Sequence, residues 1–518
     1  MLFIVMSVSH YDLCIIGGGI NGAGIARDAA GRGLRVLLLE KDDLAQATSS
    51  ASTKLVHGGL RYLEFYAFRL VRESLKERER LLKIAPHIIW PMEFVLPHHK
   101  AVRPLWMIKA GLYLYDRLGG PKKLKPSRQI NLKSHNYGAP LKDEFAKGFV
   151  YTDCWVQDSR LVVLNAMDAR QKGADIFTRC ECEKIEYQNN RWCVKYKNKM
   201  TGEALEISAS MLVNAAGPWV QHLLQQNQFY EMDKSIPKVK LVKGSHIIIP
   251  RAQEGAQCYI LQQNDGRIVF SIPYENDYTL IGTTDVPYYD DAGDVRIDEQ
   301  EMSYLLSAYN RFFKAAIDRK DILWTYSGVR ALFNDGKPDA RKVTRDYVLY
   351  RHQNFAAPFY SIFGGKITTY RQLSEKLVTM LLSEYQINKP SWTAQKPLPG
   401  GDFGAQSLEE FIAQSKRDFD WLPDDLLRRY ANHYGTKLYE FLGAAKSLND
   451  LGEHFGAGLY AIEIDYLVQR EFALTAEDII WRRTKAGMRL SDEEMQHIES
   501  YLNDKRSIPL SAAPRVAV

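Results

Sequence analysis

The sequence predicts an α/β protein: a Rossmann-like βαβ unit at the start, an antiparallel sheet in the middle of the chain and a helical C-terminal domain. Three observations predict this class. Residues 11 to 40 read as a strand, a glycine-rich turn, a helix and a second strand. Residues 241 to 250 and 267 to 285 have the alternation of neighbouring antiparallel strands. Beyond about residue 390 the pattern becomes helical, with few strand-like runs.

Composition limits the functions that the chain can have. At 518 residues it is long enough for about three domains. Its 46% hydrophobic and 25% charged residues are ordinary for a soluble globular protein. Lys and Arg number 68 against 62 Asp and Glu, and the net charge of +6 is too small to indicate a nucleic-acid partner. The function must therefore be sought in motifs.

Cysteine usage and the apolar segments bear on cofactor class and location. The six cysteines stand at 14, 154, 180, 182, 193 and 258 without the spacing of a zinc or iron–sulfur site, so we expect reduced thiols and no metal. The opening MLFIVM lacks the basic segment and cleavage site of a signal peptide, which predicts a cytoplasmic chain. No apolar run approaches the roughly 20 residues that span a bilayer, so any membrane contact should be peripheral.

The first motif, YDLCIIGGGINGAGIARDAAGRGLRVLLLE, occupies residues 11 to 40. Gly17 permits a tight turn after the first strand, Gly19 lets the backbone approach a pyrophosphate, and Gly22 lets the helix pack closely on the strand. Glu40 ends the second strand, where it can accept hydrogen bonds from both ribose hydroxyls of an adenosine; it would repel a 2′-phosphate, which disfavours NADP. We expect the neighbouring residues Ile20, Asn21 and Lys41 to contact the same dinucleotide.

The fingerprint alone does not separate NAD from FAD, but its position and two later segments favour FAD. The motif begins at residue 11 of a long chain, ahead of any catalytic domain. MLVNAAGPWV (211 to 220) is an apolar strand that ends in a sharp turn, where Ala215 and Gly217 would lie beside a cofactor. FYSIFGGKITTYRQLSEKLV (359 to 378) is a strand, a turn and a helix, whose N-terminus would stabilise an anionic reduced flavin. The turn residues expected at FAD are Gly364, Gly365 and Thr368.

Six ordered motifs make the chain similar to a known family. They are TSSASTKLVHGGLRYLE (48 to 64), LVKGSHIIIP (241 to 250), IGTTDVPY (281 to 288), WTYSGVRALF (324 to 333), VTRDYVLY (343 to 350) and FGGKITTYR (363 to 371). Together they resemble the FAD-dependent glycerol-3-phosphate dehydrogenases. The resemblance continues through DLGEHFG (450 to 456) and IIWRRTKAGM (479 to 488), and so covers nearly the whole chain.

The resemblance implies a D-amino-acid-oxidase-like architecture with interleaved domains. An FAD-binding domain would take approximately residues 10–90, 150–235 and 340–390 of a 10–390 region. A substrate-binding β domain would take approximately 91–149 and 236–339. A helical domain would follow at 391–518, after the Pro/Gly-rich segment KPLPGGDFG.

The resemblance also implies a reaction in glycerol catabolism. The family oxidises sn-glycerol 3-phosphate to dihydroxyacetone phosphate by hydride transfer to FAD, and passes the electrons to membrane quinone. Guanidinium groups suit a phosphate dianion because they form charge-assisted bidentate hydrogen bonds, and Arg330 and Arg345 match family positions around the substrate. Further matching positions near the substrate hydroxyls and the flavin edge are Arg61, Tyr62 and Lys366.

The general base stays open at this stage. His246 is a candidate base or substrate ligand because an unperturbed imidazole accepts protons near neutral pH. A cationic cluster would lower its proton affinity, yet the same cluster would also lower the pKa of the substrate hydroxyl. The catalytic candidates are therefore Arg330, Lys366, His246 and Arg61.

The loop after Glu40 matches the family segment that contacts the FAD phosphates and ring. Its expected cofactor contacts are Thr48, Ser49, Ser50, Lys54, His57, Gly58 and Gly59. One departure from the family is visible, because Ala331 stands where the family usually has Pro after the YSGVR arginine. This change could loosen the loop that carries Arg330, but it removes no hydrogen-bond donor.

Residues 100 to 125, KAVRPLWMIKAGLYLYDRLGGPKKLK, have two interpretations. Seven Lys and Arg with one acidic residue are interleaved with apolar side chains, which suits an interfacial helix on anionic lipid. The alternative is a solvated basic helix with its apolar face in the core. Residues 66 to 84 read as a surface helix with a buried stripe. A peripheral location on the inner face of the cytoplasmic membrane follows from the first interpretation, and a homodimer is an open alternative to a single chain.

Three other functions remain in view. The first is another flavoenzyme of the same architecture, such as an amino-acid oxidase or an oxygen-reducing glycerol-phosphate oxidase, which would form peroxide. The second is an NAD-linked Rossmann dehydrogenase, which would be colourless. The third is a flavin-binding redox sensor or membrane-docking module without turnover.

Overall fold

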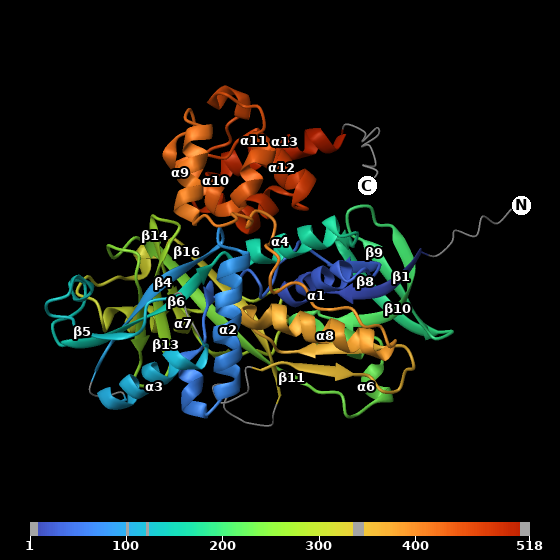
Figure 1. Ribbon diagram of the computed structural model, residues 1–518, viewed down its shortest axis with the longest axis horizontal. Coiled ribbons are helices and arrows are strands. Elements are labelled where there is room, and N and C mark those ends of the chain that lie inside the picture. Colours follow the sequence, from blue (N-terminus) through green and yellow to red (C-terminus); the bar gives the residue numbers. More distant parts are fainter. Residues whose placement is uncertain (1–8, 100–102, 121–123, 335–345, 508–518) are drawn as a thin grey trace, which may run out of the picture. The chain divides into compact units, whose positions relative to one another are not determined.

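A computed structural model describes residues 9–99, 103–120, 124–334 and 346–507 of the chain. The chain divides into two compact units, Met1–Leu398 and Pro399–Val518. The division falls within the Pro/Gly-rich segment that marked the expected start of the helical domain. Figure 1 shows the two long sheets of the first unit and the separate group of helices of the second.

The first sheet has eight strands and carries the predicted βαβ unit. Its main path runs β17-β18-β10-β1-β2-β7, with β9 on β10 and β8 on β9. The strands β1, β2, β7, β10 and β18 are parallel where they pair. The apolar runs predicted as strands are buried, as expected for a parallel sheet covered by helices. The bounds are β1 (Ser9–Ile16), β2 (Val36–Leu39), β7 (Asp175–Phe177), β8 (Cys180–Gln188), β9 (Arg191–Asn198), β10 (Ala204–Asn214), β17 (Val348–Arg351) and β18 (Phe359–Phe363).

Three helices pack together beside this sheet. Helix α1 (Ile20–Gly31) contacts both α4 (Asp158–Gln171) and α8 (Tyr370–Glu384), and Figure 1 shows the three helices side by side. Buried ion pairs join this layer: Arg27 Nε lies 2.6 Å from Asp168 Oδ2, linking α1 to α4. The strand, turn and helix predicted at 359 to 378 are thus confirmed as β18, the short 3₁₀ turn η5 (Ile367–Thr369) and α8.

The second sheet has ten strands, most of them antiparallel. Its main path runs β15-β11-β14-β13-β12-β4-β6-β3, with β16 on β11 and β5 on β6. The predicted hairpin at 267 to 285 is confirmed as β13 and β14, and its neighbour at 241 to 250 as β11. The bounds are β3 (Leu55–Val56), β4 (Ile89–Pro97), β5 (Arg128–Asn131), β6 (Lys147–Val156), β11 (Val239–Pro250), β12 (Cys258–Gln262), β13 (Ile268–Tyr274), β14 (Tyr278–Gly282), β15 (Val286–Pro287) and β16 (Trp324–Phe333).

Two strands depart from the expected domain ranges. β3 lies within the range 10–90 and most of β6 within 150–235, yet both pair in the second sheet. The reason is local: the chain leaves β2, crosses to the second sheet at β3, and pairs there with β6. The chain therefore passes between the two sheets earlier than expected.

The remaining elements of the first unit include α5 and α6, which pack on the first sheet, and α7, which contacts β11, β13 and β14 of the second. Helix α2 (Phe68–Ile84) buries one stripe, including Leu75 and Leu81, and so confirms the predicted surface helix. Helix α3 (Leu105–Leu118) lies within the segment that had two interpretations. The other elements are η1 (Leu60–Phe65), η2 (Asn136–Gly138), η3 (Gly217–Trp219), α5 (Val220–Gln226), α6 (Phe229–Met232), α7 (Glu299–Asn310) and η4 (Arg319–Asp321).

The second unit is helical, as predicted, and its described residues contain one isolated β-bridge, between His454 and Tyr460. Buried tyrosines and leucines form its core, and the Arg429 guanidinium is paired with the buried carboxylate of Glu463. Within the described part of the whole chain, no helix is both long and apolar enough to cross a membrane. Its elements are α9 (Leu408–Asp418), α10 (Asp424–Tyr434), η6 (Gly435–Lys437), α11 (Leu438–Leu442), η7 (Leu448–Leu451), α12 (Ala461–Arg470), the π-helical η8 (Asp478–Arg483), η9 (Ala486–Met488) and α13 (Asp492–Ser507).

Candidate active site

A cavity of about 510 Å³ lies where the parallel strands of the first sheet end. The carboxyl ends of parallel strands are where α/β sheets bind ligands, because the helix N-termini that follow point there. Its lining comes from both sheets of the first unit, in segments far apart in the sequence. The lining residues fall within the ranges 16–21, 39–57, 180–182, 215–226, 328–332 and 364–368, not all of whose residues face the cavity, and Tyr62, Gly244 and Asp291 are isolated members.

The predicted glycine turn forms one wall of this cavity. Gly17 has φ +111°, and a Cβ there would lie 2.6 Å from Ala215 O, so the turn requires glycine. Gly19 lines the cavity and begins α1, while Ser49 Oγ accepts a hydrogen bond from Ile20 N at 3.0 Å. Gly22 lies outside the lining, and a Cβ there would lie 1.9 Å from Gly17 O. Its place fits the predicted packing role.

Glu40 and Lys41 belong to the same wall and lie next to the glycine turn. The Glu40 carboxylate accepts hydrogen bonds from Gly18 N at 2.6 Å and from Asp42 N at 2.8 Å. Burial raises the pKa of Glu40 to about 7, although both backbone donors lower it. The Lys41 ammonium lies 3.8 Å from the centre of the Trp219 ring, and both residues line the cavity.

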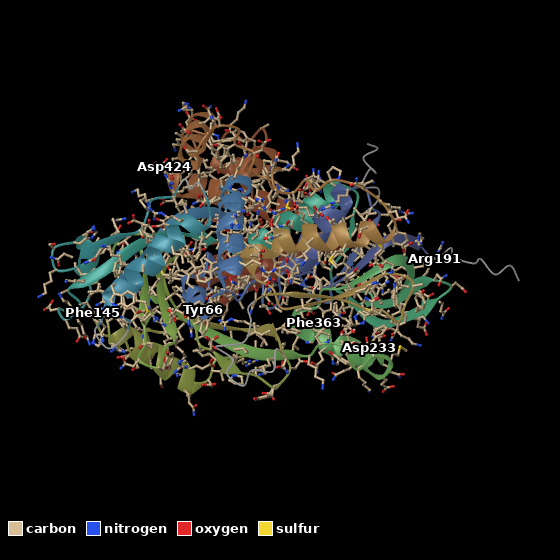
Figure 2. The ribbon with its side chains drawn as sticks, turned by 60° about the horizontal axis from the view of Figure 1, so that its bottom comes forward. Tyr66, Phe145, Arg191, Asp233, Phe363 and Asp424 are labelled. Carbon is tan, nitrogen blue, oxygen red and sulfur yellow. The ribbon has the colours of Figure 1, made fainter. Side chains whose placement is uncertain are left out.

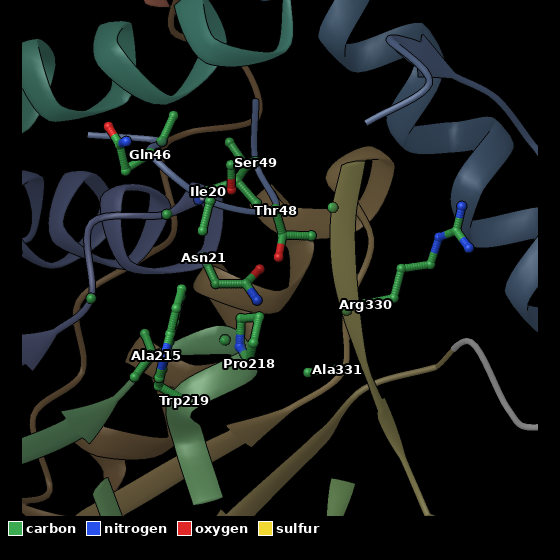
Figure 3. A pocket seen from close by; sticks show the side chains of 18 of the residues that line it. Ile20, Asn21, Gln46, Thr48, Ser49, Ala215, Pro218, Trp219, Arg330 and Ala331 are labelled. Carbon is green, nitrogen blue, oxygen red and sulfur yellow. Dashed lines mark hydrogen bonds between the residues drawn. The ribbon is translucent and has the colours of Figure 1, made fainter. Parts of the chain in front are cut away.

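The residues around the glycine turn fit FAD. Asn21 Oδ1 is buried at the cavity and accepts no hydrogen bond from the described residues, so a bound ligand with a donor would satisfy it. The Gly364–Gly365 turn closes on the same residue: both glycines have positive φ, and a Cβ on Gly365 would lie 3.1 Å from Asn21 Nδ2. Figure 3 shows Asn21, Thr48 and Ser49 facing one space, with Trp219 across it.

The loop of residues 48 to 59 lies partly inside and partly behind the cavity wall. Thr48, Ser49 and His57 line the cavity. Ser50 and Lys54 lie outside the lining: the Lys54 ammonium donates to the Asp158 carboxylate at 2.9 Å and to Ser50 O at 3.0 Å. This buried ion pair holds the loop from behind. Gly58 and Gly59 also lie outside the lining, directly after His57.

Arg330 and Lys366 come from segments of the lining that are remote in the sequence from Glu40. The Arg330 guanidinium donates to Asp285 Oδ1 at 2.6 Å and to Thr283 Oγ1 at 3.0 Å, which fixes the plane of the group. Figure 3 shows Arg330 extending from β16 on the side away from Ile20 and Asn21. The Lys366 ammonium lies 3.8 Å from the centre of the Tyr62 ring. Arg330, Lys366 and Tyr62 all line the cavity.

Two other predicted substrate residues, His246 and Arg61, lie outside the lining, and a third, Arg345, is not among the described residues. His246 is buried on β11, where its Nε2 lies 3.0 Å from Thr53 Oγ1 and its ring stacks on Tyr326. Burial, followed by the charges of Arg330 and Lys54, holds the pKa of His246 well below its usual value. Arg61 is half-buried in η1 outside the lining. Arg345 falls outside the described residues, so its predicted role has no structural description.

The cavity also contains residues that the motifs did not single out. Thr53 stands between His246 and the cavity, and Trp219 faces Lys41. Both lie inside segments that the motifs covered, so their place in the sequence could have marked them. Cys180 and Cys182 line the cavity from β8 with no sequence signal, because they reach it only through the strand order of the sheet.

Two histidines, His57 and His222, lie in the cavity lining. Burial lowers the pKa of His57; Asp153 opposes this shift, whereas Lys366 and Arg78 add to it. The ring is therefore neutral at pH 7 and can accept a proton. In the described part of the chain, no group of three or more His, Cys, Asp or Glu could hold a metal ion.

Comparisons with known proteins agree with this architecture. Residues 12–371 match the family model "FAD dependent oxidoreductase", and residues 391–503 match "C-terminal domain of alpha-glycerophosphate oxidase". The chain is 50% identical to a D-erythritol 1-phosphate dehydrogenase of Brucella abortus (strain 2308), covering 93% of this chain and 96% of that one. It is 46% identical to the aerobic glycerol-3-phosphate dehydrogenase of Escherichia coli (strain K12), covering 97% and 99%. A solved glycerol-3-phosphate dehydrogenase from Bacillus halodurans, complexed with FAD, superposes with a TM-score of 0.76 at 28% identity, covering 96% and 95%.

Proposed function

The chain belongs to the family of FAD-dependent oxidoreductases that includes the aerobic glycerol-3-phosphate dehydrogenases, and we propose that it oxidises sn-glycerol 3-phosphate to dihydroxyacetone phosphate. One observation carries the proposal: Arg330 and Lys366 line the same cavity as the glycine turn and Glu40. Two cations in the lining of a cavity that fits FAD suit a small phosphorylated alcohol.

The residues of the cavity divide the work of the reaction between them. FAD, when bound, accepts the hydride from the alcohol carbon. Arg330 binds the phosphate, with the Asp285 carboxylate and Thr283 hydroxyl holding the guanidinium in place. Lys366 and Tyr62 bind around the substrate hydroxyl, and the positive charge of Lys366 lowers the pKa of that hydroxyl.

The proton of the hydroxyl requires an acceptor, and the neutral histidines His57 and His246 are the candidates. His57 lines it directly. His246 is linked to the cavity through one hydrogen bond, between its Nε2 and Thr53 Oγ1. It therefore acts on the substrate by orienting the Thr53 hydroxyl. Replacing each histidine by Gln separates the two roles, because direct proton transfer contributes typically 10²–10⁴-fold to a rate.

The electrons pass on to membrane quinone, and the enzyme binds peripherally to the inner face of the cytoplasmic membrane. An exposed apolar surface supports this location. It consists of Phe65, Tyr66 and Phe68 before and at the start of α2, and of Trp106, Met107, Tyr113 and Leu114 on α3. Figure 2 labels Tyr66 at the N-terminal end of α2. Arg103 and Glu64 form an ion pair that joins the start of α3 to η1. A homodimer stays a prediction without support from the single chain.

D-erythritol 1-phosphate is a second candidate substrate. It is favoured by the 50% identity with the dehydrogenase of that name from Brucella abortus, against 46% with the Escherichia coli enzyme. Both compounds combine a phosphate ester with secondary hydroxyl groups, so the same cationic residues could bind either one. The two compounds differ in the length of the polyol, and contacts to the phosphate alone do not distinguish one length from the other.

The test is anaerobic addition of each polyol phosphate to the yellow purified protein, followed by absorbance in the flavin band. We expect glycerol 3-phosphate to bleach the flavin faster than D-erythritol 1-phosphate does. The reverse order would identify D-erythritol 1-phosphate as the preferred substrate. Absence of bleaching with both would contradict the proposal. Turnover with a quinone analogue and with oxygen then identifies the acceptor, since stoichiometric peroxide would indicate an oxidase.

A further inference from the structure

We propose that Tyr115 is a positioning residue for this oxidation, although it lies outside the cavity. Its hydroxyl fixes the turn of residues 57 to 59, which carries His57 to the cavity wall. Gly58 N donates a hydrogen bond to Tyr115 Oη at 2.8 Å, and Tyr115 Oη donates to Asp153 Oδ2 at 2.7 Å. All three groups are buried, so water does not compete with these bonds.

Charge fixes the direction of this hydrogen-bond chain. The Arg78 guanidinium donates to Asp153 Oδ1 at 2.6 Å and to Thr152 O at 3.0 Å, which favours the ionised carboxylate. A carboxylate only accepts, so the Tyr115 hydroxyl must donate to Asp153 and present a lone pair to Gly58 N. Burial, followed by the charge of Asp153, raises the pKa of Tyr115 well above its usual value, which keeps the phenol protonated.

The space around the turn leaves little room for movement while this bond is intact. A Cβ on Gly58 would lie 2.5 Å from Leu75 and 2.6 Å from Tyr115 Oη. The next residue, Gly59, has φ +77°, and a Cβ there would lie 2.1 Å from the Tyr62 ring. His57 N donates to Thr368 Oγ1 at 3.3 Å. The turn is therefore held by Tyr115 on one side and by η5 on the other.

The turn in turn supports two residues that face the cavity. The Tyr62 ring packs on Gly59 and stands 3.8 Å from the Lys366 ammonium. His57, Tyr62 and Lys366 all line the cavity, whereas the phosphate candidate Arg330 is held separately by Asp285 and Thr283. Loss of the Tyr115 hydroxyl should thus disturb the reacting end of the site and leave phosphate binding intact. Small misplacements of reacting groups cost large factors in rate.

The variant that tests this role is Tyr115→Phe, which keeps the ring and removes both hydrogen bonds. The holoprotein should retain one FAD per chain. At saturating glycerol 3-phosphate the rate of flavin reduction should fall about ten-fold, while the apparent Kd for the substrate stays within about two-fold. The visible spectrum of the oxidised flavin should also change, because Lys366 and Tyr62 no longer hold their places.

Tyr259→Phe is the matched control. Tyr259 is fully buried on β12, and its hydroxyl donates to Tyr137 O at 2.8 Å, outside the cavity lining. Both variants lose a buried phenol hydroxyl, so both should lower the melting temperature by a similar few degrees. Only Tyr115→Phe should lower the rate of flavin reduction. Wild-type reduction in Tyr115→Phe, or equal slowing in both variants, would overturn the proposal.

Two further measurements keep the test decisive. If Tyr115→Phe does not yield folded holoprotein, Asp153→Asn should slow reduction in the same way. Arg78 keeps the remaining amide oxygen as its acceptor, so the amide nitrogen, a donor, replaces the acceptor that faces the Tyr115 hydroxyl. A wild-type rate there would refute the role. The inference rests on the proposed function, whose failure is recognised separately by absence of bleaching in the wild type. In that event the oxidised-flavin spectra of the Tyr115 and Tyr259 variants still test the positioning role of Tyr115, since these spectra need no substrate.

Discussion

Arg330 is the residue on which the substrate assignment depends most. Arg330→Ala removes a guanidinium that Asp285 and Thr283 hold in a fixed plane. Charge-assisted hydrogen bonds contribute about 1.5–3 kcal/mol each, and the variant leaves the Asp285 carboxylate facing the phosphate. We expect kcat/KM for glycerol 3-phosphate to fall by about 10²–10⁴-fold with FAD still bound, measured by steady-state assay and flavin content.

The conservative variant Arg330→Lys provides the control for charge. Lysine keeps one positive charge but cannot form the two-pronged contact, so its activity should lie between those of the wild type and Arg330→Ala. Loss of flavin from either variant, instead of loss of substrate reduction, would place Arg330 at the cofactor and contradict the assignment.

Glu40 gives the site a pH dependence that is separate from catalysis. Its carboxyl has a pKa of about 7 in the protein without ligand, because burial disfavours the charged form. Ribose hydroxyls donate hydrogen bonds to the ionised carboxylate, so FAD binding should weaken as Glu40 takes up a proton below pH 7. At pH 6 about a tenth of the groups are ionised, which predicts a Kd for FAD about ten-fold higher than at pH 8, measured by flavin fluorescence.

Glu40→Gln tests the source of that dependence. The amide keeps an acceptor oxygen but cannot ionise, so FAD should bind more weakly and with little change between pH 6 and pH 8. A pH slope that survives in the variant would show that another group controls binding.

Which single residues face the cavity could be predicted only in part. Gly17 and Glu40 have chemical roles that the nucleotide-binding motif itself defines, the role of Lys366 comes from the family resemblance, and all three line the cavity. Lys54 and His246 belong to equally specific motifs but turn to partners remote in the sequence, Asp158 and Tyr326. A motif predicts which segment lies near the cavity. Tertiary packing determines which partner each side chain of that segment contacts, and so whether the side chain faces the cavity.

Helix α3 shows the same limit for a whole element. Its sequence allowed either a membrane face or a core face, and the structure contains a buried face together with an exposed apolar one. Ile108 and Tyr115 are buried, while Trp106 and Tyr113 are 70% and 58% exposed. Helical periodicity separates the two faces, but only the packing of the helix shows which aromatic residues remain outside.

The exposed face of α3 leads to a prediction about membrane binding. Replacing Trp106 and Tyr113 together by Ala removes two aromatic side chains of the kind that insert at a lipid interface. We expect binding to anionic phospholipid vesicles to weaken about ten-fold or more in co-sedimentation, with unchanged flavin reduction in solution. Added salt should weaken wild-type binding, because basic residues contribute to it.

A control variant shows whether aromatic exposure alone explains the result. Tyr289 is 90% exposed, beyond the end of β15 and on a different part of the first unit. Tyr289→Ala should bind vesicles as the wild type does. Equal loss in both variants would mean that vesicle binding is nonspecific and that α3 has no special role.

At the scale of the whole molecule, three strand ends separated by hundreds of residues form one site. The strands β1, β10 and β18 are neighbours and parallel, so their carboxyl ends meet at the cavity. This arrangement could be predicted, because each of the three segments carries a strand followed by a glycine turn. The pairing of β3 with β6 could not be predicted, because a strand of two residues is too short to show a pattern that indicates its neighbour in the sheet.

The cavity lining lies wholly within the first unit, and this leads to a prediction about the effect of FAD on the two units. Adding FAD to the apoprotein should slow amide exchange at residues 16–22, 215–219 and 364–368, by up to about 1,000-fold when FAD is present at 1,000 times its Kd. Exchange in residues 399–507 should stay unchanged. Hydrogen-exchange mass spectrometry checks both expectations, and the exchange rates of the second unit without FAD are the reference for its rates with FAD. Strong protection there would show that FAD binding also stabilises the second unit, and would contradict a cofactor site confined to the first.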